Sequence, residues 1–132
     1  LGTGPEARVV SAMEVVPLVT PVADFVYSLE VKRNPNWREE IRYDAPPRRP
    51  VREVAQIEQV ALDAYRALDC RDVGRVDVRC DATGAPKFIE LNPLPGLAPG
   101  WSDIALLWER VGRSYDDLIL SILDRACARL RL

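Results

Sequence analysis

Four polar residues, Arg75, Asp77, Glu90 and Asn92, have types and spacing that could serve chemistry at a single site. The arginine and the aspartate are two residues apart, and so are the glutamate and the asparagine. Residues 81–86 lie between the two pairs and have the composition Asp-Ala-Thr-Gly-Ala-Pro, which is typical of a turn. Two strands joined by this turn would therefore carry all four side chains.

The predicted strands cover residues 73–81 and 87–92, and centring the turn between Thr83 and Gly84 sets their register. In that register the aspartate directly faces the glutamate, and the arginine faces the asparagine. Because side chains alternate between the two faces of a strand, all four polar side chains lie on one face. The opposite face is then apolar, with Val76, Val78, Ile89 and Leu91.

The polar face invites two interpretations. Two carboxylates that face each other across a strand pair repel, and a divalent cation would relieve the repulsion. Asp77, Glu90 and the amide carbonyl of Asn92 are hard oxygen ligands of the kind that Mg²⁺ or Mn²⁺ prefers. The alternative is a solvated sheet face on which Glu90 forms an ion pair with Arg75.

Composition excludes several classes of function. The 132 residues include no histidine, which excludes a Ser-His-Asp triad, a Cys–His pair and a histidine-ligated zinc ion. Eighteen basic and twenty acidic residues give a net charge of −2, so no general attraction to nucleic acid or to an anionic membrane is expected. The three cysteines, Cys70, Cys80 and Cys127, lack metal-site spacing and are odd in number, which favours a reducing cytoplasm.

The order of the predicted elements indicates an α+β fold with a largely antiparallel sheet and flanking helices. An apolar stripe at three- and four-residue steps predicts a helix over 51–68, and Ser114 with Asp117 resembles a capping box at the start of the last helix. The remaining expected elements are strands over 7–16 and 24–32, a proline- and arginine-rich loop over 33–50, a rigid loop over 93–100, a helix over 102–111 closed by Gly112, and a last helix ending at Arg129.

The motif Arg75-Val-Asp77, a hairpin, and then Glu90-Leu-Asn92-Pro-Leu-Pro-Gly96 resembles the carboxyl-terminal signature of D-alanine–D-alanine ligases and their ATP-grasp relatives. The segment from Tyr27 to Lys32 resembles the family's strand that delivers a phosphate-binding lysine. The resemblance runs from about residue 7 to the end of the chain. It implies the carboxyl-terminal ATP-grasp subdomain as the fold.

The resemblance also implies an activity. Such ligases use ATP to convert a carboxylate to an acyl phosphate, which an amine then attacks to form a peptide or amide bond. Asp77, Glu90 and Asn92 match the family's Mg²⁺ ligands, and Mn²⁺ is an alternative ion. Arg75 matches the arginine that stabilises the developing negative charge, a role that suits a permanently charged planar donor.

Three further residues receive roles from the resemblance, and each also has a plainer interpretation. Lys32 matches the lysine that binds the nucleotide phosphates at the edge of a lid, or it is a surface lysine. Gly96 lies where a backbone N–H holds the oxyanion, or it serves a turn. Ser102 lies near the position that binds the carboxylate of the second substrate, or it is a helix N-cap. Trp101 and Trp108 are expected to pack in the core.

The chain departs from the family pattern at Pro93, Leu97 and Ala98, where threonine, methionine and threonine are usual, and the stretch before Ser102 is one residue longer. A ligase for another amino acid or peptide, or a non-catalytic interaction module, therefore stays open. The resemblance implies ATP and an amino-acid or peptide as partners and is compatible with a homodimer. It further implies that residues 1–132 are the carboxyl-terminal portion, with the substrate domain, the glycine-rich loop and the adenine-contacting segment upstream.

Overall fold

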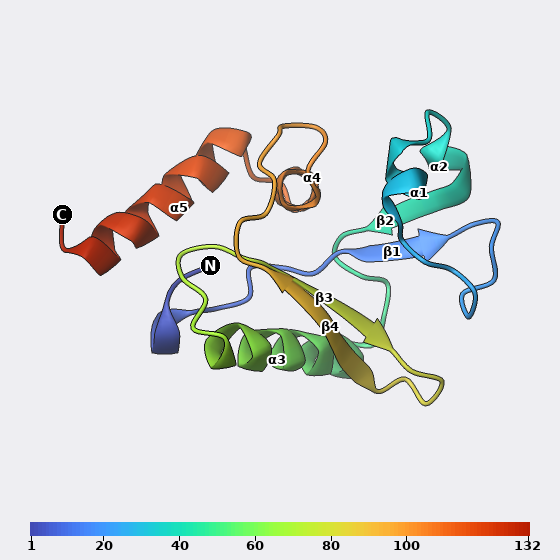
Figure 1. The fold of residues 1–132 in the computed structure, drawn as a ribbon, viewed down its shortest axis with the longest axis horizontal. Coiled ribbons are helices and arrows are strands. Elements are labelled where there is room, and N and C mark those ends of the chain that lie inside the picture. Colours follow the sequence, from blue (N-terminus) through green and yellow to red (C-terminus); the bar gives the residue numbers. More distant parts are fainter.

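The computed structural model describes residues 1–132 and has two small antiparallel sheets with helices packed around them. The α+β expectation is confirmed, and Figure 1 shows that the β1–β2 pair and the β3–β4 pair form separate parts of the molecule. The elements are a 3₁₀ turn at Gly4–Glu6, β1 at Glu14–Pro17, α1 at Leu29–Arg33, α2 at Trp37–Glu40, β2 at Ile41–Asp44, α3 at Val51–Ala67, β3 at Arg75–Cys80, β4 at Pro86–Asn92, α4 at Asp103–Arg110 and α5 at Tyr115–Leu130.

The predicted hairpin is present, and its open end has the predicted register. Arg75 pairs with Asn92 and Asp77 pairs with Glu90, so the four polar residues share one face as expected. The sequence pattern therefore fixes the part of the hairpin that carries the candidate site.

Nearer the turn the predicted register is wrong by one residue. Val78 pairs with Phe88 instead of Ile89, and Cys80 pairs with Pro86, because β4 holds an extra residue at a bulge. The cause is the turn, where the Asp81 side chain accepts hydrogen bonds from two backbone N–H groups and closes a tighter loop than the symmetrical one. Ile89 is consequently 58% exposed and does not belong to the apolar face.

Helix α3 begins one residue after Pro50 and packs along the β3–β4 hairpin (Figure 1). Its buried Tyr65 contacts Ala7 and Cys70, and the tyrosine hydroxyl donates to the carbonyl of Gly2 at 2.9 Å. A Cβ atom at Gly74 would lie 2.8 Å from the Tyr65 ring, so only glycine lets the strand enter beside this helix. This packing fixes the position where β3 starts.

The first predicted strand, 7–16, is mostly wrong, because only β1 at its end pairs with another strand. The partner of β1 is β2, which lies within the predicted loop over 33–50. Residues 7–13 pair with no strand. At their start Arg66 on α3 donates to the carbonyl of Ala7, and it also donates to the carbonyls of Gly4 and Pro5 in the preceding 3₁₀ turn.

The second predicted strand, 24–32, is also wrong, because residues 29–33 form the short helix α1. Ser28 caps it by accepting a hydrogen bond from the N–H of Val31, which favours the helical turn over the extended form suggested by the valines. The predicted loop contains α2 in addition to β2. Ile41 and Tyr43 of β2 are buried while Arg42 between them is exposed, an alternation that the surrounding prolines and arginines obscure.

Helices α4 and α5 pack against each other through Ala105, Trp108 and Leu118. The predicted capping box is confirmed, since Ser114 and Asp117 bond each other's backbone N–H groups. Trp108 packs in this core as expected, but Trp101 is 49% exposed and does not. None of the helices has the length and apolar character needed to cross a membrane.

Candidate functional site

The candidate site is built around the guanidinium of Arg75 at the first position of β3. Its Nε and Nη2 atoms each donate to one carboxylate oxygen of Asp77 at 2.8 Å, a bidentate pair between residues on one face of one strand. Its Nη2 also lies 3.4 Å from Oε1 of Glu90 on the opposite strand. The arginine therefore stands between the two facing carboxylates and offsets their repulsion.

The fourth guanidinium contact reaches Asp103, the first residue of α4. Arg75 donates from Nη1 to Oδ2 of Asp103 at 2.9 Å, and Lys32 donates from Nζ to Oδ1 of the same carboxylate at 2.7 Å. Asp103 is only 9% exposed. The two candidate cations, one on α1 and one on β3, therefore meet on a single buried carboxylate. We call Lys32, Arg75, Asp77, Glu90 and Asp103 the charged cluster.

Asp103 is the residue that sequence reasoning missed. An acidic residue in the first turn of a helix is common, because it interacts favourably with the helix dipole. The residue type at position 103 therefore gave no sign that Asp103 belongs to the site. Its partners lie 71 and 28 residues away in the chain. Only the tertiary structure brings Asp103 to Lys32 and Arg75.

Two tyrosines complete the surroundings of Asp103. The hydroxyl of Tyr27 donates to Oδ1 of Asp103 at 3.2 Å and shares a short hydrogen bond with the hydroxyl of Tyr43. Burial first, and then the bond to Tyr43 and the charge of Asp103, raise the pKa of Tyr27 far above its ordinary value. Tyr27 is therefore a hydrogen-bond donor and has no role as a base near neutral pH.

The charge of Arg75 is permanent in this setting. Its burial alone would lower its pKa, but the hydrogen bonds with Asp77 and the charges of Asp77, Asp103 and Glu90 outweigh that effect and raise the pKa. A cation that is always charged and held by three carboxylates suits the stabilisation of a negative charge that develops nearby.

The side-chain oxygens of Asp77, Glu90 and Asn92 are the donor atoms of the expected metal site, and most of them already have partners within the chain. Both Asp77 oxygens are engaged by Arg75, Asn92 Oδ1 accepts from the N–H of Leu94 at 3.1 Å, and the Glu90 side chain is 62% exposed. No three His, Cys, Asp or Glu side chains gather around one point. The set of two facing carboxylates and an amide fits Mg²⁺ or Mn²⁺, with the guanidinium now supplying the positive charge that an ion would bring.

Gly96 and Ser102 lie together in the loop before α4. The Ser102 hydroxyl is buried and accepts from the N–H of Ala98 at 3.0 Å, so its side chain does not cap the helix, although it stands at the N-cap position. A Cβ atom at Gly96 would lie 2.8 Å from Ser102 Oγ. Glycine is therefore required at position 96 for the two segments to approach each other.

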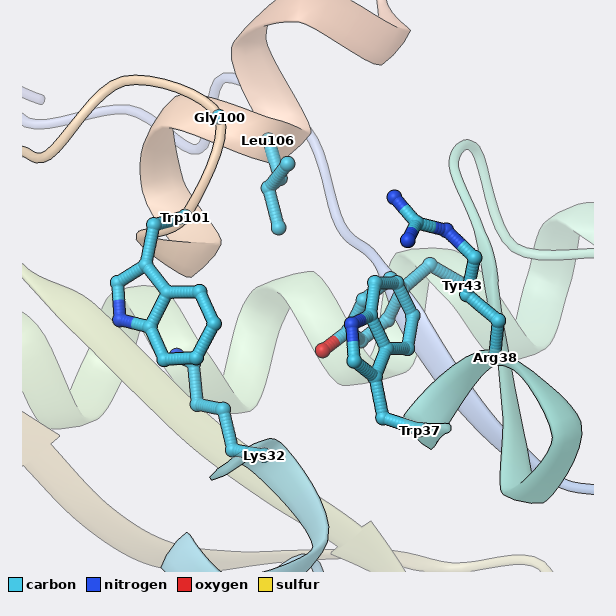
Figure 2. Close-up of a pocket in the computed structure, with 7 residues that line it drawn as sticks. All are labelled: Lys32, Trp37, Arg38, Tyr43, Gly100, Trp101 and Leu106. Atoms are coloured by element: carbon cyan, nitrogen blue, oxygen red, sulfur yellow. The ribbon is translucent and has the colours of Figure 1, made fainter. Parts of the chain in front are cut away.

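A pocket of about 230 Å³ opens beside Lys32. Figure 2 shows Trp37 and Trp101 on opposite sides of it, with the lysine below Trp101. The ring of Trp37 packs against Tyr43 with centroids 5.2 Å apart, and the guanidinium of Arg38 lies 4.6 Å from the Trp37 ring. The pocket is thus aromatic in its walls and cationic at its edge, and it adjoins the loop that carries Ser102.

Comparison with known proteins gives one consistent family. The family model for the D-ala D-ala ligase C-terminus matches residues 4–124. A D-alanine--D-alanine ligase from Bordetella avium is 34% identical over 131 residues, covering 99% of this chain and 38% of that protein. One from Polaromonas sp. is 36% identical over 124 residues, covering 93% of this chain and 34% of that protein.

The crystal structure of a D-alanine--D-Alanine ligase from Bacillus anthracis is similar in fold, with a TM-score of 0.60 and 25% sequence identity. The match covers 70% of this chain and 30% of that one. The chain spans well under half the length of the curated relatives that it matches.

Proposed function

We propose that this chain, which belongs to the D-ala D-ala ligase C-terminus family, supplies the metal-binding and charge-stabilising part of an ATP-dependent carboxylate–amine ligase. In the proposed reaction ATP phosphorylates a carboxylate, and an amine attacks the acyl phosphate to form a peptide or amide bond with release of phosphate. The amino-terminal substrate domain, the glycine-rich loop and the adenine-contacting segment belong to the same polypeptide upstream in this proposal.

One observation carries the proposal. The charged cluster brings Lys32 on α1 and Arg75 on β3, which are far apart in the chain, to the face of the hairpin that presents Asp77 and Glu90. Phosphoryl transfer requires the negative charge on several oxygens to be neutralised at fixed positions. A lysine, an arginine and a pair of facing carboxylates within one set of ion pairs are the groups that this task requires.

The residues would divide the work as follows. Asp77, Glu90 and Asn92 would hold Mg²⁺ or Mn²⁺, which supplies neutralisation of the ATP phosphate oxygens when bound. Lys32 would contact the nucleotide phosphates, and Arg75 would stabilise the negative charge of the acyl phosphate and of the tetrahedral intermediate. The N–H of Gly96 would donate to the oxyanion, and Ser102 would donate to the carboxylate of the amine substrate.

The relatives are named for D-alanine, and the identity of the amino acids used by this protein belongs to the proposal. The pocket beside Lys32 has a volume of about 230 Å³ and is walled by Trp37, Trp101, Tyr43 and Leu106, so a side chain larger than a methyl group would fit in it. We therefore propose that substrates include amino acids larger than alanine. The three free thiols fit the cytoplasmic location that we infer, and a homodimer is compatible with the proposal.

The test uses the full-length protein and follows ATP-dependent phosphate release with a panel of D- and L-amino acids that includes alanine and the aromatic residues. Asp77→Asn and Glu90→Gln should each lower the rate by about 100-fold, because a ligand to the charge-neutralising ion is lost. Asp63→Asn on the exposed face of α3 is the matched control and should leave the rate unchanged.

Unchanged phosphate release in Asp77→Asn and Glu90→Gln would refute the assigned metal site. Absence of amino-acid-dependent release in the unmodified protein, with every member of the panel, would instead favour the non-catalytic interaction module. The two results separate an error in the site from an error in the function.

A further inference from the structure

Asp103 makes an unusual set of contacts for a residue at the start of a helix. Its Oδ1 accepts from Lys32 Nζ at 2.7 Å and from the Tyr27 hydroxyl at 3.2 Å, and its Oδ2 accepts from Arg75 Nη1 at 2.9 Å. Each oxygen is therefore committed to a different part of the chain. With 9% of the residue exposed, these interactions take place largely away from water, where charged hydrogen bonds are strong.

The carboxylate joins two units that have no strand pairing between them. Lys32 lies on α1, in the segment of chain that connects β1 to β2, whereas Arg75 starts β3 in the other pair. Both side chains are positively charged and would repel each other if nothing stood between them. A single carboxylate between them removes the repulsion and sets their separation.

The charges of the cluster agree with this arrangement. Asp77, Glu90 and Asp103 bring three negative charges, and Lys32 and Arg75 bring two positive ones, which leaves one negative charge. A divalent cation would turn that balance to one positive charge and so favour a polyphosphate. Without Asp103, Lys32 would lose its only ion-pair partner and Arg75 would lose its Nη1 contact.

We propose that Asp103 is a positioning residue that sets the separation between Lys32, on the phosphates of ATP, and Arg75, on the phosphoryl group that ATP transfers. This inference rests on the proposed function, because it assigns both cations to the same reaction. A plainer role for Asp103 is an acidic residue that stabilises the first turn of α4 through the helix dipole. The plainer role predicts a loss of stability alone, with no selective effect on Lys32.

The first test measures the reactivity of Lys32, since Lys32 and Lys87 are the only lysines in the chain. An enclosed, ion-paired amine reacts more slowly with acetic anhydride than a free one does. In Asp103→Asn we expect acetylation of Lys32 to become about threefold faster relative to Lys87, measured by mass spectrometry of the peptides. Glu109→Gln, an exposed acid on the same helix, removes the same charge and should leave the ratio unchanged.

The second test measures the KM for ATP in the full-length enzyme, because KM does not depend on the fraction of molecules that are folded. Asp103→Asn should raise it about tenfold, since a charged hydrogen bond that orders Lys32 is lost. In a Lys32→Met background the same substitution should raise the KM for ATP by only about twofold, because the hold on Lys32 is already gone and only the contact with Arg75 remains to be lost.

Each result decides one claim. An unchanged Lys32 to Lys87 ratio in Asp103→Asn overturns the proposed hold on the lysine, and so do additive effects in the Lys32→Met background. An unmodified enzyme that releases no phosphate with any amino acid overturns the proposed function. In that case the acetylation ratio still shows whether Asp103 holds Lys32.

Discussion

Arg75 and Asp77 form a two-point ion pair in which both Asp77 oxygens accept from the guanidinium at 2.8 Å. A metal ion that uses Asp77 must therefore share or replace these contacts. In the proposed reaction the arginine and the ion would then compete for one carboxylate, although both are needed. Nucleotide phosphates would offer the displaced guanidinium a new partner, which links metal binding to ATP binding.

The competition predicts the effect of Arg75→Gln on Mg²⁺ binding without ATP. Removal of the guanidinium leaves Asp77 and Glu90 facing each other without a cation, so the affinity of the chain for Mg²⁺ should rise by about tenfold. Isothermal titration calorimetry with MgCl₂ measures the change. Arg79→Gln is the charge-matched control, because Arg79 lies on the same strand but donates to backbone carbonyls of Val22, Ala23 and Phe25.

Equal Mg²⁺ affinity in Arg75→Gln and Arg79→Gln would show that general charge, and not release of Asp77, controls the binding. Weaker binding in Arg75→Gln would show that Asp77 is not a ligand. Turnover by full-length Arg75→Gln should fall by about 100-fold despite the tighter Mg²⁺ binding.

Gly96→Ala should disturb the loop before α4, because the added Cβ would lie 2.8 Å from Ser102 Oγ. We expect a loss of about 1 kcal/mol in the free energy of unfolding and a fall of about tenfold in kcat/KM of the full-length enzyme. Urea unfolding and phosphate release measure the two effects. The double variant Gly96→Ala with Ser102→Ala removes the clashing oxygen but also the acceptor of the Ala98 N–H, so it should regain only part of the stability and none of the activity. Recovery of both would show that Ser102 has no part in substrate binding.

The features that could be predicted from sequence are those that depend on local spacing. The i, i+2 pattern around Arg75 and Glu90 sufficed to place four polar side chains on one face of a hairpin. The apolar stripe from Val54 to Tyr65 sufficed for α3, and the Ser114–Asp117 pair sufficed for the start of α5. In each case the interaction that decides the structure lies within a few residues.

The features that could not be predicted depend on contacts between distant residues or on single hydrogen bonds. Residues 7–13 pair with no strand although their sequence suggests one, and Arg66 bonds only Ala7 at their start. Helix α1 forms because Ser28 caps it. The bulge in β4 results from the turn that Asp81 closes. The prediction assumed a turn centred between Thr83 and Gly84, and that assumption gives strands without a bulge. Asp103 joins Lys32 to Arg75 only after three separate elements have packed together.

The Asp81 turn gives a prediction about pH. Hydrogen bonds from the side chain and then the backbone of Thr83, with a further one from the N–H of Ala85, lower the pKa of Asp81 to about 2 from 3.8. Because the folded form has the lower pKa, these bonds stabilise the turn above pH 3.8, and the contribution is lost as the pH falls through about 2. The carboxyl carbon of Asp81, followed by NMR, should titrate near the lower value.

Thr83→Ala removes the hydroxyl that donates to Asp81 at 2.6 Å, and it should move the titration of Asp81 upward. Thr20→Ala, at an exposed bend after β1 that makes no bond with Asp81, is the control and should leave it unchanged. A midpoint near 3.8 in the unmodified chain would contradict the hydrogen bonding of this turn.

The last prediction concerns Asp72, which ties helix α5 to the segment before β3. Arg129 donates from Nη2 to Oδ2 of Asp72 at 2.8 Å, and Nε of Arg129 contacts both carboxylate oxygens. Asp72→Asn should lower the free energy of unfolding by about 1–2 kcal/mol, measured by urea unfolding at pH 7. Asparagine tolerates the positive φ of 61° at this position, so the loss reports the ion pair and not backbone strain.

The pH dependence follows from the same pair. The hydrogen bond from Arg129 lowers the pKa of Asp72 below 3.8, so the stabilisation is present above that pH and is lost as the pH falls through the lowered value. The difference between the unmodified chain and Asp72→Asn should therefore shrink in acid. Asp69→Asn is a matched control with a φ of 48°, and its exposed pair with Arg71 should contribute less than about 0.5 kcal/mol. Equal losses in the two variants would show that Arg129 does not stabilise the fold through Asp72.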